Sequence, residues 1–334
     1  MKSGLTLGKF APLHQGHQLV IETALAEMDE VTIIIYDAPD TTCVPLSVRA
    51  NWLRMLYPCI KVIEAWDGPT EVGDTKDIKQ KHEDYILNKL KIRGITHFYS
   101  SEFYGEHMSL ALGAVNRLVD TLRRGIPVSG TEIRRKPFAF RRYIHPLVYR
   151  DLVTNVAFLG APSTGKTTIA QRMAQEYCTV WMPEYGREYW DKHQIERRLS
   201  LEQLLEIAEE HLRREEALLY QADQYLFTDT NAITTFMFSH DYHRMALPRL
   251  AELANHASSR YDLVFLCDID IPCQDTWDRS GNVKRTIFQK QIVADLLVRR
   301  VPFFTLSGTL EERVYKVKKI LTQHQKYKSL SELF

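Results

Sequence analysis

The sequence has almost no net charge with which to attract a polyanion. Its 334 residues include 43 lysines and arginines against 42 aspartates and glutamates, a formal charge of +1 at pH 7. A protein that binds nucleic acid or an anionic membrane through a broad surface needs a clear excess of basic residues. We therefore expect no DNA partner and no membrane partner.

Cysteine is scarce, and the cysteines that occur are not paired in the sequence. Their number is odd, and no two have the C-x-x-C spacing of a zinc or redox motif. This pattern excludes a disulfide framework and favours reduced thiols in a cytoplasmic protein. The five residues are Cys43, Cys59, Cys178, Cys267 and Cys273.

Long apolar runs, internal repeats and low-complexity segments are also missing. No run approaches the length of a membrane span, and the N-terminus lacks the basic and apolar stretches of a signal peptide. The composition, 45% hydrophobic and 25% charged, is typical of a soluble globular protein. Because 334 residues exceed the usual size of one core, we expect two domains, residues 1–150 and 151–334.

A phosphate-binding loop lies near the middle of the chain. Residues 160–167 read G-A-P-S-T-G-K-T, after the apolar run 155–159 and before a helical pattern. In this P-loop, backbone N–H groups surround phosphate oxygens, Lys166 reaches the β- and γ-phosphates, and the Thr167 hydroxyl ligates Mg²⁺. The predicted ATP site comprises Gly160, Ser163, Thr164, Gly165, Lys166, Thr167 and Thr168.

Acidic residues follow two other predicted strands of the second half. Asp229 ends the apolar run that starts at residue 225, where it could ligate Mg²⁺ or act as a base. Residues 183–189 follow a predicted strand at 178–182 and suit an acceptor pocket. The candidate pocket residues are Glu184, Tyr185, Arg187 and Asp229. We expect the polar stretch 275–285 to form a mobile lid whose Arg279 and Arg285 close over the transferring phosphoryl group.

The first half carries two further signals for phosphate chemistry. Strands and helices alternate, which predicts a parallel sheet with ligands beyond the carboxyl ends of its strands. Residues 14–17 read H-Q-G-H just after the apolar run 5–7, and imidazoles there could stabilise charge on a phosphoryl group. Residues 128–134 read V-S-G-T-E-I-R, which places helix-capping hydroxyls about one turn before an arginine.

Together these strings resemble the motifs (H/T)-x-G-H and I-S-x-T-x-x-R of the adenylyl- and cytidylyltransferase superfamily, with Val128 in place of the usual isoleucine. The resemblance implies a Rossmann-like domain in which a substrate phosphate attacks the α-phosphate of a nucleoside triphosphate. It implies that His14, His17 and Lys9 stabilise the transition state. The implied ATP contacts are Gly8, Phe10, Gly16, Ser129, Thr131 and Arg134.

The order of the two motifs, with E-Y-G-R-E at 184–188 and F-T-D-T-N-A-I-T-T at 227–235, resembles the NadR family over nearly the whole chain. The resemblance implies a nicotinamide-nucleotide adenylyltransferase followed by a ribosylnicotinamide kinase. The implied substrates are ATP, nicotinamide mononucleotide and nicotinamide riboside, with Mg²⁺ as cofactor. Arg49 and Trp52 are implied contacts of the nicotinamide nucleotide. Whether Asp229 or Glu184 receives the hydroxyl proton stays open.

The chain also departs from the family pattern. Asn231 stands where many members have aspartate, and the stretch 275–279 lacks the glycine of the family's lid string. Some members carry an N-terminal helix-turn-helix, but the first catalytic loop here begins at Gly8, so none is expected.

Two alternative functions stay open at this point. A pantetheine-phosphate adenylyltransferase fused to a dephospho-coenzyme A kinase shares both motif classes, although Trp52 and the string at 184–188 speak against it. The second alternative is a nucleotide-binding sensor in which one half of the chain has no catalytic activity. The sequence does not fix the oligomeric state, and a homo-oligomer is one option.

Overall fold

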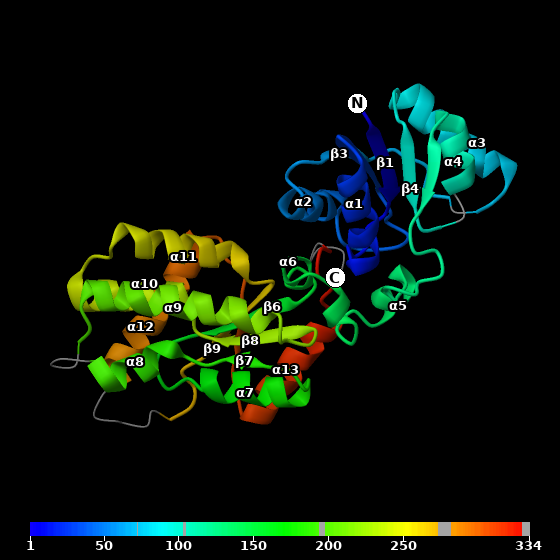
Figure 1. Cartoon of the computed structure of the whole chain (residues 1–334). Helices are drawn as coiled ribbons and strands as arrows, with labels where there is room; N and C mark the ends of the chain where they lie inside the picture. The colour runs from blue at the N-terminus through cyan, green and yellow to red at the C-terminus, as the bar shows by residue number, and fades with distance from the viewer. Residues whose placement is uncertain (72, 103–104, 194–197, 273–281, 329–334) are drawn as a thin grey trace. The chain divides into compact units, whose positions relative to one another are not determined.

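The structure is a computed structural model that describes residues 1–71, 73–102, 105–193, 198–272 and 282–328 (Figure 1). The chain divides into two compact units, Met1–Tyr149 (unit 1) and Arg150–Phe334 (unit 2). This division falls one residue before the expected boundary. Each unit has its own sheet, so each is described by itself.

Unit 1 is built on a parallel five-stranded sheet in the order β3-β2-β1-β4-β5. Helices α1 and α2 pack on one face, whereas η1 and α4 cover the other. The strands are β1 (Ser3–Gly8), β2 (Glu30–Tyr36), β3 (Lys61–Ala65), β4 (His97–Ser100) and β5 (Val115–Leu118). The helices are α1 (Gln15–Glu27), α2 (Leu46–Leu56), α3 (Lys76–Asp84), the π-helical turn η1 (Tyr85–Lys89), α4 (Gly105–Leu112), α5 (Gly130–Arg135), the 3₁₀ turn η2 (Arg141–Tyr143) and α6 (Pro146–Tyr149).

Two elements of unit 1 were not predicted from the sequence. Strand β5 has four residues, all exposed, because it lies at the edge of the sheet. It therefore lacks the apolar run by which β2 was recognised, whose last four residues are buried under helices on both faces. Helix α4 has only eight residues, too few for a strong periodic pattern.

Unit 2 is built on a second parallel sheet in the order β10-β9-β6-β8-β7. The strands are β6 (Thr154–Leu159), β7 (Trp181–Met182), β8 (Tyr225–Asp229), β9 (Leu263–Cys267) and β10 (Phe304–Leu306). The helices are α7 (Lys166–Glu176), α8 (Tyr185–His193), α9 (Leu201–Leu219), α10 (Ala232–His243), α11 (Pro248–Arg260), α12 (Asn282–Val298) and α13 (Leu310–Gln323).

The central strand β6 is buried on both faces. Val156 and Phe158 face one core, which includes residues of α7 and α13. Ala157 and Leu159 face a second core formed with α10, α11 and α12. This alternation is the period of a strand covered on both sides. The predicted fold, two α/β units with parallel sheets, is confirmed.

Strand β7 is shorter than the predicted strand at 178–182. Just after helix α7, Cys178 adopts a left-handed conformation (φ 49°), and the Thr179 N–H still donates to the Ala174 carbonyl. The chain therefore reaches the sheet only at residue 181.

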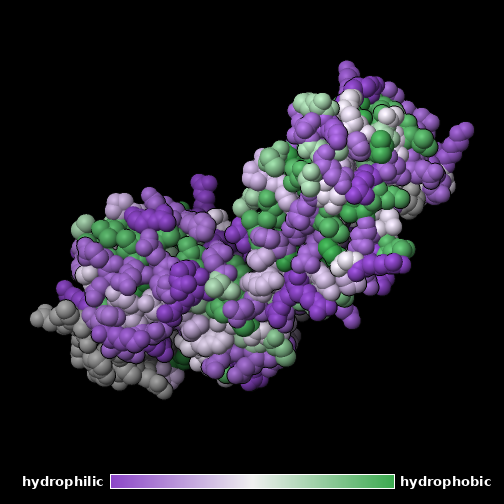
Figure 2. Space-filling model, viewed as in Figure 1, coloured by the Kyte–Doolittle hydropathy of each residue, from purple (hydrophilic) through white to green (hydrophobic). Residues whose placement is uncertain are grey.

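The parallel arrangement determines where the sites lie. In each unit the carboxyl ends of all strands share one edge of the sheet, where the candidate residues gather. Hydrophilic residues cover much of the face seen in Figure 2, with apolar residues scattered among them. None of the described helices is both long and apolar enough to cross a membrane.

Candidate active sites

Helix α1 begins with a histidine that acts as its cap. His14 Nδ1 accepts a hydrogen bond from the Gly16 N–H at 3.1 Å, so the ring proton lies on Nε2. That Nε2 is buried and has no hydrogen-bond partner among the described residues. Gly16 is required because a Cβ there would lie 2.9 Å from His14 Cε1. The loop after β1 therefore presents an unused N–H donor.

His17 lies directly beside His14. The centroids of the two rings are 3.8 Å apart, and Phe10 packs edge-on against His17 at 5.0 Å. Burial lowers the pKa of both imidazoles, and the positive charge of Arg134 lowers both further. The pKa of His14 falls to about 4. Both rings are therefore neutral at pH 7 and act as hydrogen-bonding groups, not as cations.

Helix α5 carries the second motif. Ser129 caps this helix in a capping box with Glu132, to whose Oε2 its hydroxyl donates at 2.7 Å. The Arg134 guanidinium donates to the Thr131 hydroxyl at 2.9 Å and to the Ala11 carbonyl at 3.2 Å. These bonds hold the arginine against the loop after β1.

A cavity of about 400 Å³ collects these groups, a size usual for ligand pockets. A Cβ on Gly130 would lie 3.5 Å from His14 Nε2, so α5 approaches the histidine with no side chain between them. The Lys9 ammonium donates to the Thr41 hydroxyl at 3.0 Å, and burial, then Arg134, lowers its pKa. The residues predicted for catalysis and for ATP in this unit all line the cavity, namely Gly8, Lys9, Phe10, His14, Gly16, His17, Ser129, Thr131 and Arg134. Such a concentration of N–H donors and cations suits a polyphosphate.

A turn after β5 adds an arginine that the motifs did not predict. Asp120 and Arg123 have left-handed φ values of 44° and 50°. The Asp120 carboxylate accepts hydrogen bonds from the N–H groups of Arg124 (2.8 Å), Gly125 (3.1 Å) and Ile126 (3.1 Å), which fixes the turn. Arg123 lines the cavity, whereas its neighbour Arg124 is not among the lining residues. No local motif marks this loop, so only the fold reveals it.

Arg49 and Trp52 are the two implied contacts of the nicotinamide nucleotide. Both side chains are fully buried on α2, and neither lines the cavity. The Arg49 guanidinium instead donates to the backbone carbonyls of Val44, Lys9 and Tyr36. Neither side chain reaches the cavity in this structure, and their contact with the nicotinamide nucleotide stays a prediction. Arg49 holds the loop after β1 in place, and Trp52 packs in the core.

In unit 2 the P-loop connects β6 to α7. Gly160 has φ 140°, and a Cβ there would lie 2.6 Å from the Cys267 carbonyl oxygen. Gly165 precedes α7 with φ 83°. Both positions therefore require glycine. The Lys166 ammonium is buried and folds back to the Ala161 carbonyl at 3.0 Å.

Three side chains from distant parts of the chain brace this loop. Arg285 donates to the Ser163 carbonyl at 3.1 Å, and Arg313 donates to the Thr164 carbonyl at 2.7 Å. The Gln289 Oε1 atom accepts a hydrogen bond from the Ala161 N–H at 2.8 Å. None of the three was predicted in this role, because their partners are more than a hundred residues away.

The lid prediction fails at Arg285. This residue lies in helix α12 and not in a loop, and it is only 4% exposed. Its guanidinium braces the P-loop through the Ser163 carbonyl in this structure. Arg279 and the departures at 275–279 lie outside the described residues.

The other predicted P-loop residues differ in exposure. Ser163 lines the cavity of unit 2, and Thr168 is exposed in the first turn of α7. Thr164 is fully buried, and its hydroxyl donates to the Ala161 carbonyl at 2.8 Å. Thr164 thus shapes the loop and does not present its hydroxyl to a ligand.

Asp229 ends β8 beside the P-loop. The Thr167 hydroxyl donates to Asp229 Oδ2 at 2.5 Å, while Oδ1 is buried without a partner in the described chain. Burial, together with the negative charge of Glu184, raises the pKa of Asp229 to about 6. A hydroxyl beside an unsatisfied carboxylate oxygen fits Mg²⁺, which takes few protein oxygens and keeps waters. No group of three or more His, Cys, Asp or Glu that could hold a metal occurs in the described ranges.

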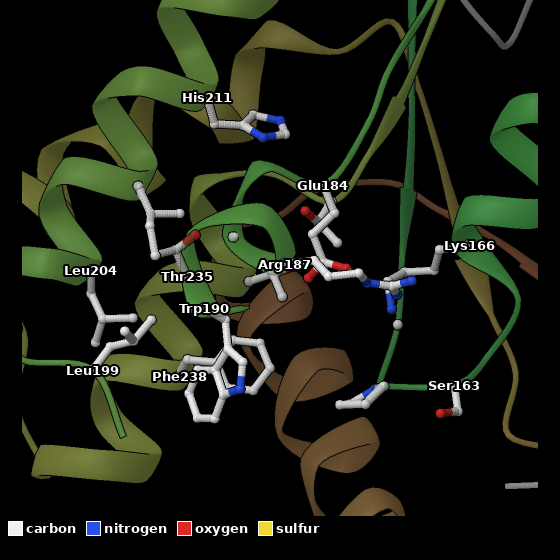
Figure 3. A pocket seen from close by; sticks show the side chains of 16 residues that line it. Ser163, Lys166, Glu184, Arg187, Trp190, Leu199, Leu204, His211, Thr235 and Phe238 are labelled. Carbon is white, nitrogen blue, oxygen red and sulfur yellow. The ribbon is translucent and has the colours of Figure 1, made fainter. Parts of the chain in front are cut away.

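A cavity of about 130 Å³ lies next to Lys166 (Figure 3). Glu184 and Arg187 line it and form an ion pair at 3.5 Å. Tyr185 was predicted for this pocket but does not line it, because its ring packs under the Arg214 guanidinium at 4.0 Å. Two of the predicted acceptor residues therefore reach the cavity.

The other walls of this cavity were not recognised in the sequence. They include Trp190 from α8 and Phe238 from α10. Leu199, Leu204 and His211 also line the cavity, from the segment before α9 and from α9 itself (Figure 3). Such residues read as ordinary core positions in a periodic helix. An aromatic and apolar slot next to a P-loop suits a planar base.

Two protein families match consecutive parts of the chain. Residues 5–136 match the cytidylyltransferase-like family, and residues 155–313 match the AAA domain family. The trifunctional NAD biosynthesis/regulator proteins NadR of Salmonella typhimurium and Escherichia coli are each 28% identical to this chain over 319 residues. Each alignment covers 90% of this chain and 77% of the relative. The chain is similar to the NadR proteins over nearly its whole length.

Two solved NadR structures share the fold. A NadR protein in complex with NAD and AMP-PNP has a TM-score of 0.57 and 22% identity, and one in complex with NR has a TM-score of 0.59 and 22% identity. Each match covers 96% of this chain and 95% of the other. The chain thus shares the fold of these NadR structures, with one cavity at the histidine motif and another at the P-loop.

Proposed function

We propose that this chain is a bifunctional enzyme of the NadR family that makes NAD in two ATP-dependent steps. The kinase unit phosphorylates nicotinamide riboside, and the adenylyltransferase unit joins the resulting mononucleotide to AMP. The observation that carries the proposal is the presence of two complete phosphate-handling sites on one chain that is similar to the NadR proteins. His14, His17 and Arg134 form one, and Lys166 and Asp229 mark the other.

In the adenylyl step, a phosphate oxygen of nicotinamide mononucleotide attacks the α-phosphorus of ATP. The bond from that phosphorus to the bridging oxygen of the β-phosphate breaks, and pyrophosphate leaves. His14 Nε2–H and His17 are placed to stabilise the charge that builds up on the α-phosphoryl oxygens. Lys9 assists them as a cation.

The leaving pyrophosphate needs its own cations. Arg134 and Arg123 are on the cavity wall, and Thr131 and Ser129 lie at the start of α5. Arg134 offers the planar donor set that matches phosphate oxygens. These residues are placed to hold the β- and γ-phosphates of ATP.

In the kinase step, the 5′-hydroxyl oxygen of the riboside attacks the γ-phosphorus of ATP, and ADP leaves. The hydroxyl proton passes to a carboxylate. Glu184 is the better candidate, because it lines the cavity, whereas Asp229 is fully buried and already accepts the Thr167 hydroxyl. Trp190 and Phe238 supply the aromatic walls for the base.

Thr167 and Asp229 would hold Mg²⁺, whose charge neutralises the phosphate oxygens when it is bound. The support is the buried Asp229 Oδ1 that lacks a partner among the described residues. Lys166 would bind the β- and γ-phosphates from the opposite side.

The test uses purified full-length protein with ATP and Mg²⁺. Nicotinamide mononucleotide should give NAD and pyrophosphate, and nicotinamide riboside should give the mononucleotide and ADP. Pantetheine 4′-phosphate and dephospho-coenzyme A serve as competing substrates. Turnover of these two, without turnover of the nicotinamide compounds, would overturn the proposal, and so would nucleotide binding without any turnover.

We also propose a cytoplasmic location. Cys43, Cys59 and Cys178 are exposed free thiols, which persist in a reducing compartment. ATP-dependent synthesis of a dinucleotide coenzyme fits the same compartment.

A further inference from the structure

Three polar atoms on the wall of the kinase cavity have no hydrogen-bond partner in the described chain. They are His211 Nε2, Thr234 Oγ1 and Trp190 Nε1, and all three residues line the cavity. His211 and Thr234 are each only 5% exposed. A buried donor or acceptor without a partner is costly, so native proteins rarely keep one unless a ligand or water completes it. The cavity is therefore built to be completed by a polar ligand.

The surroundings of these atoms limit what that ligand can be. His211 lies on the same face of α9 as Leu204 and Ile207, and Thr234 lies on the same face of α10 as Phe238. Figure 3 shows the His211 ring directed into the cavity, with Glu184 and Arg187 to one side. Apolar side chains thus surround a small number of polar groups, which suits a planar aromatic group with one polar substituent.

His211 carries no charge at neutral pH. Burial, together with the positive charges of Arg260 and Arg214, lowers the pKa of its imidazole to about 4. A neutral imidazole has one N–H donor and one lone pair. A carboxamide has the matching acceptor and donors, whereas a carboxylate has acceptors only and cannot donate to the ring's lone pair.

We propose that His211, together with Thr234, hydrogen-bonds the carboxamide of the riboside base and makes the kinase select the amide over the acid. His211 is thus a specificity-determining residue, since it contacts the base and not the transferring phosphoryl group. The assignment rests on the proposed kinase function and adds the group that recognises its substrate.

The experiment compares nicotinamide riboside with nicotinic acid riboside as substrates of the full-length enzyme. His211→Leu removes both ring nitrogens, and His211→Gln keeps a donor and an acceptor. His193→Leu is the matched control, because His193 is exposed on α8 and does not line the cavity. Initial rates give kcat and KM for each riboside at saturating ATP and Mg²⁺.

His211→Leu should raise KM for nicotinamide riboside about 10- to 100-fold, since a neutral hydrogen bond to a buried group is lost. Its kcat should stay within about threefold, because the contact is equal in the ground and transition states. KM for the acid should change less than about threefold, so the preference for the amide collapses. His211→Gln should restore most of the preference for the amide, and His193→Leu should have the kcat and KM values of the unmodified enzyme.

Equal effects on both ribosides would overturn the assignment, because they would place His211 at the ribose or in the core. An unchanged KM for the amide would overturn it as well. If His211→Leu does not fold, Thr234→Val, which keeps the side-chain shape, must raise KM selectively for the amide. If the unmodified enzyme phosphorylates neither riboside, the proposed kinase function itself is wrong. If it phosphorylates them but the His211 variants behave like the unmodified enzyme, only the assignment of His211 is wrong.

Discussion

At the scale of single residues, burial decides what His14 and His17 can do. Both imidazoles are neutral at pH 7 because desolvation lowers their pKa values. A neutral ring can donate a hydrogen bond to a developing oxyanion without holding a fixed charge in the empty cavity. We therefore expect the two rings to act through N–H groups that bind charge present only in the transition state.

Replacing one key residue in each site should separate the two activities. His17→Ala should lower kcat for NAD formation from nicotinamide mononucleotide about 100- to 1,000-fold, as expected for one donor to a developing oxyanion. It should leave riboside phosphorylation unchanged. Lys166→Ala should do the reverse. Chromatography of the products formed from each substrate measures both activities of each variant. If either variant loses both activities, the two reactions do not use separate sites.

Arg123 offers a sharper test, because its neighbour is a natural control. Both arginines are exposed on one turn, but only Arg123 lines the cavity of unit 1. Arg123→Ala should raise KM for ATP in the adenylyl step about tenfold, the effect of losing one charged phosphate contact. Arg124→Ala should change it by less than twofold. Similar effects of both substitutions would show that only the general charge of the turn matters.

The raised pKa of Asp229 predicts a pH dependence of metal activation. Below about pH 6 this carboxyl holds a proton, and the proton competes with Mg²⁺ for its oxygens. The Mg²⁺ concentration that half-activates the kinase should therefore rise about tenfold between pH 7 and pH 5. Titrations of Mg²⁺ at both pH values test this. The rate of the adenylyl step, measured on the same sample at pH 5, shows whether the protein stays folded. If the Mg²⁺ concentration for half-activation of the kinase is the same at both pH values, Asp229 does not ligate the metal.

At the scale of elements, the P-loop depends on glycine for space as well as for phosphate access. A Cβ on Gly160 would lie 2.6 Å from the Cys267 carbonyl oxygen of β9, and its φ of 140° strains any other residue. Gly160→Ala should destabilise unit 2 by about 1–3 kcal/mol and abolish the kinase. Thermal unfolding and the two activities provide the measurement.

A second glycine gives the control for that experiment. A Cβ on Gly186 would lie 3.6 Å from Ile207 Cγ2, an ordinary contact, and its position in α8 favours alanine over glycine. Gly186→Ala should therefore keep or raise the unfolding temperature. If Gly160→Ala is equally well tolerated, β9 can move away from the loop and the packing argument fails.

Elements with a local signal could be predicted from the sequence, whereas long-range contacts could not. The P-loop, the histidine pair and strands β2 and β6 each have their pattern within a few residues. The brace of Arg313 on the P-loop joins residues 149 positions apart, and Arg49 clamps a loop 40 positions away. Arg49 and Trp52 were assigned to the nucleotide by family resemblance, and no pattern in the sequence indicates that both side chains are fully buried. Arg123 faces its cavity only because β5 and the turn after it fold against β4.

At the scale of the whole molecule, each unit has its own sheet, its own core and its own cavity. No candidate catalytic residue of one unit belongs to the motif of the other. Nicotinamide mononucleotide is the product of one proposed site and the substrate of the second. The chain therefore needs no shared catalytic group to run both steps, and the intermediate can pass between sites through solvent.

This independence predicts complementation between two inactive variants. His17→Ala alone should stop at nicotinamide mononucleotide, and Lys166→Ala alone should not start from nicotinamide riboside. An equimolar mixture of the two should convert the riboside to NAD, after a lag in which the free intermediate accumulates. The lag should shorten as total protein rises, because the intermediate travels between molecules. A mixture that makes no NAD, although each variant keeps its one activity, would mean that the intermediate must pass directly between the two sites of one chain.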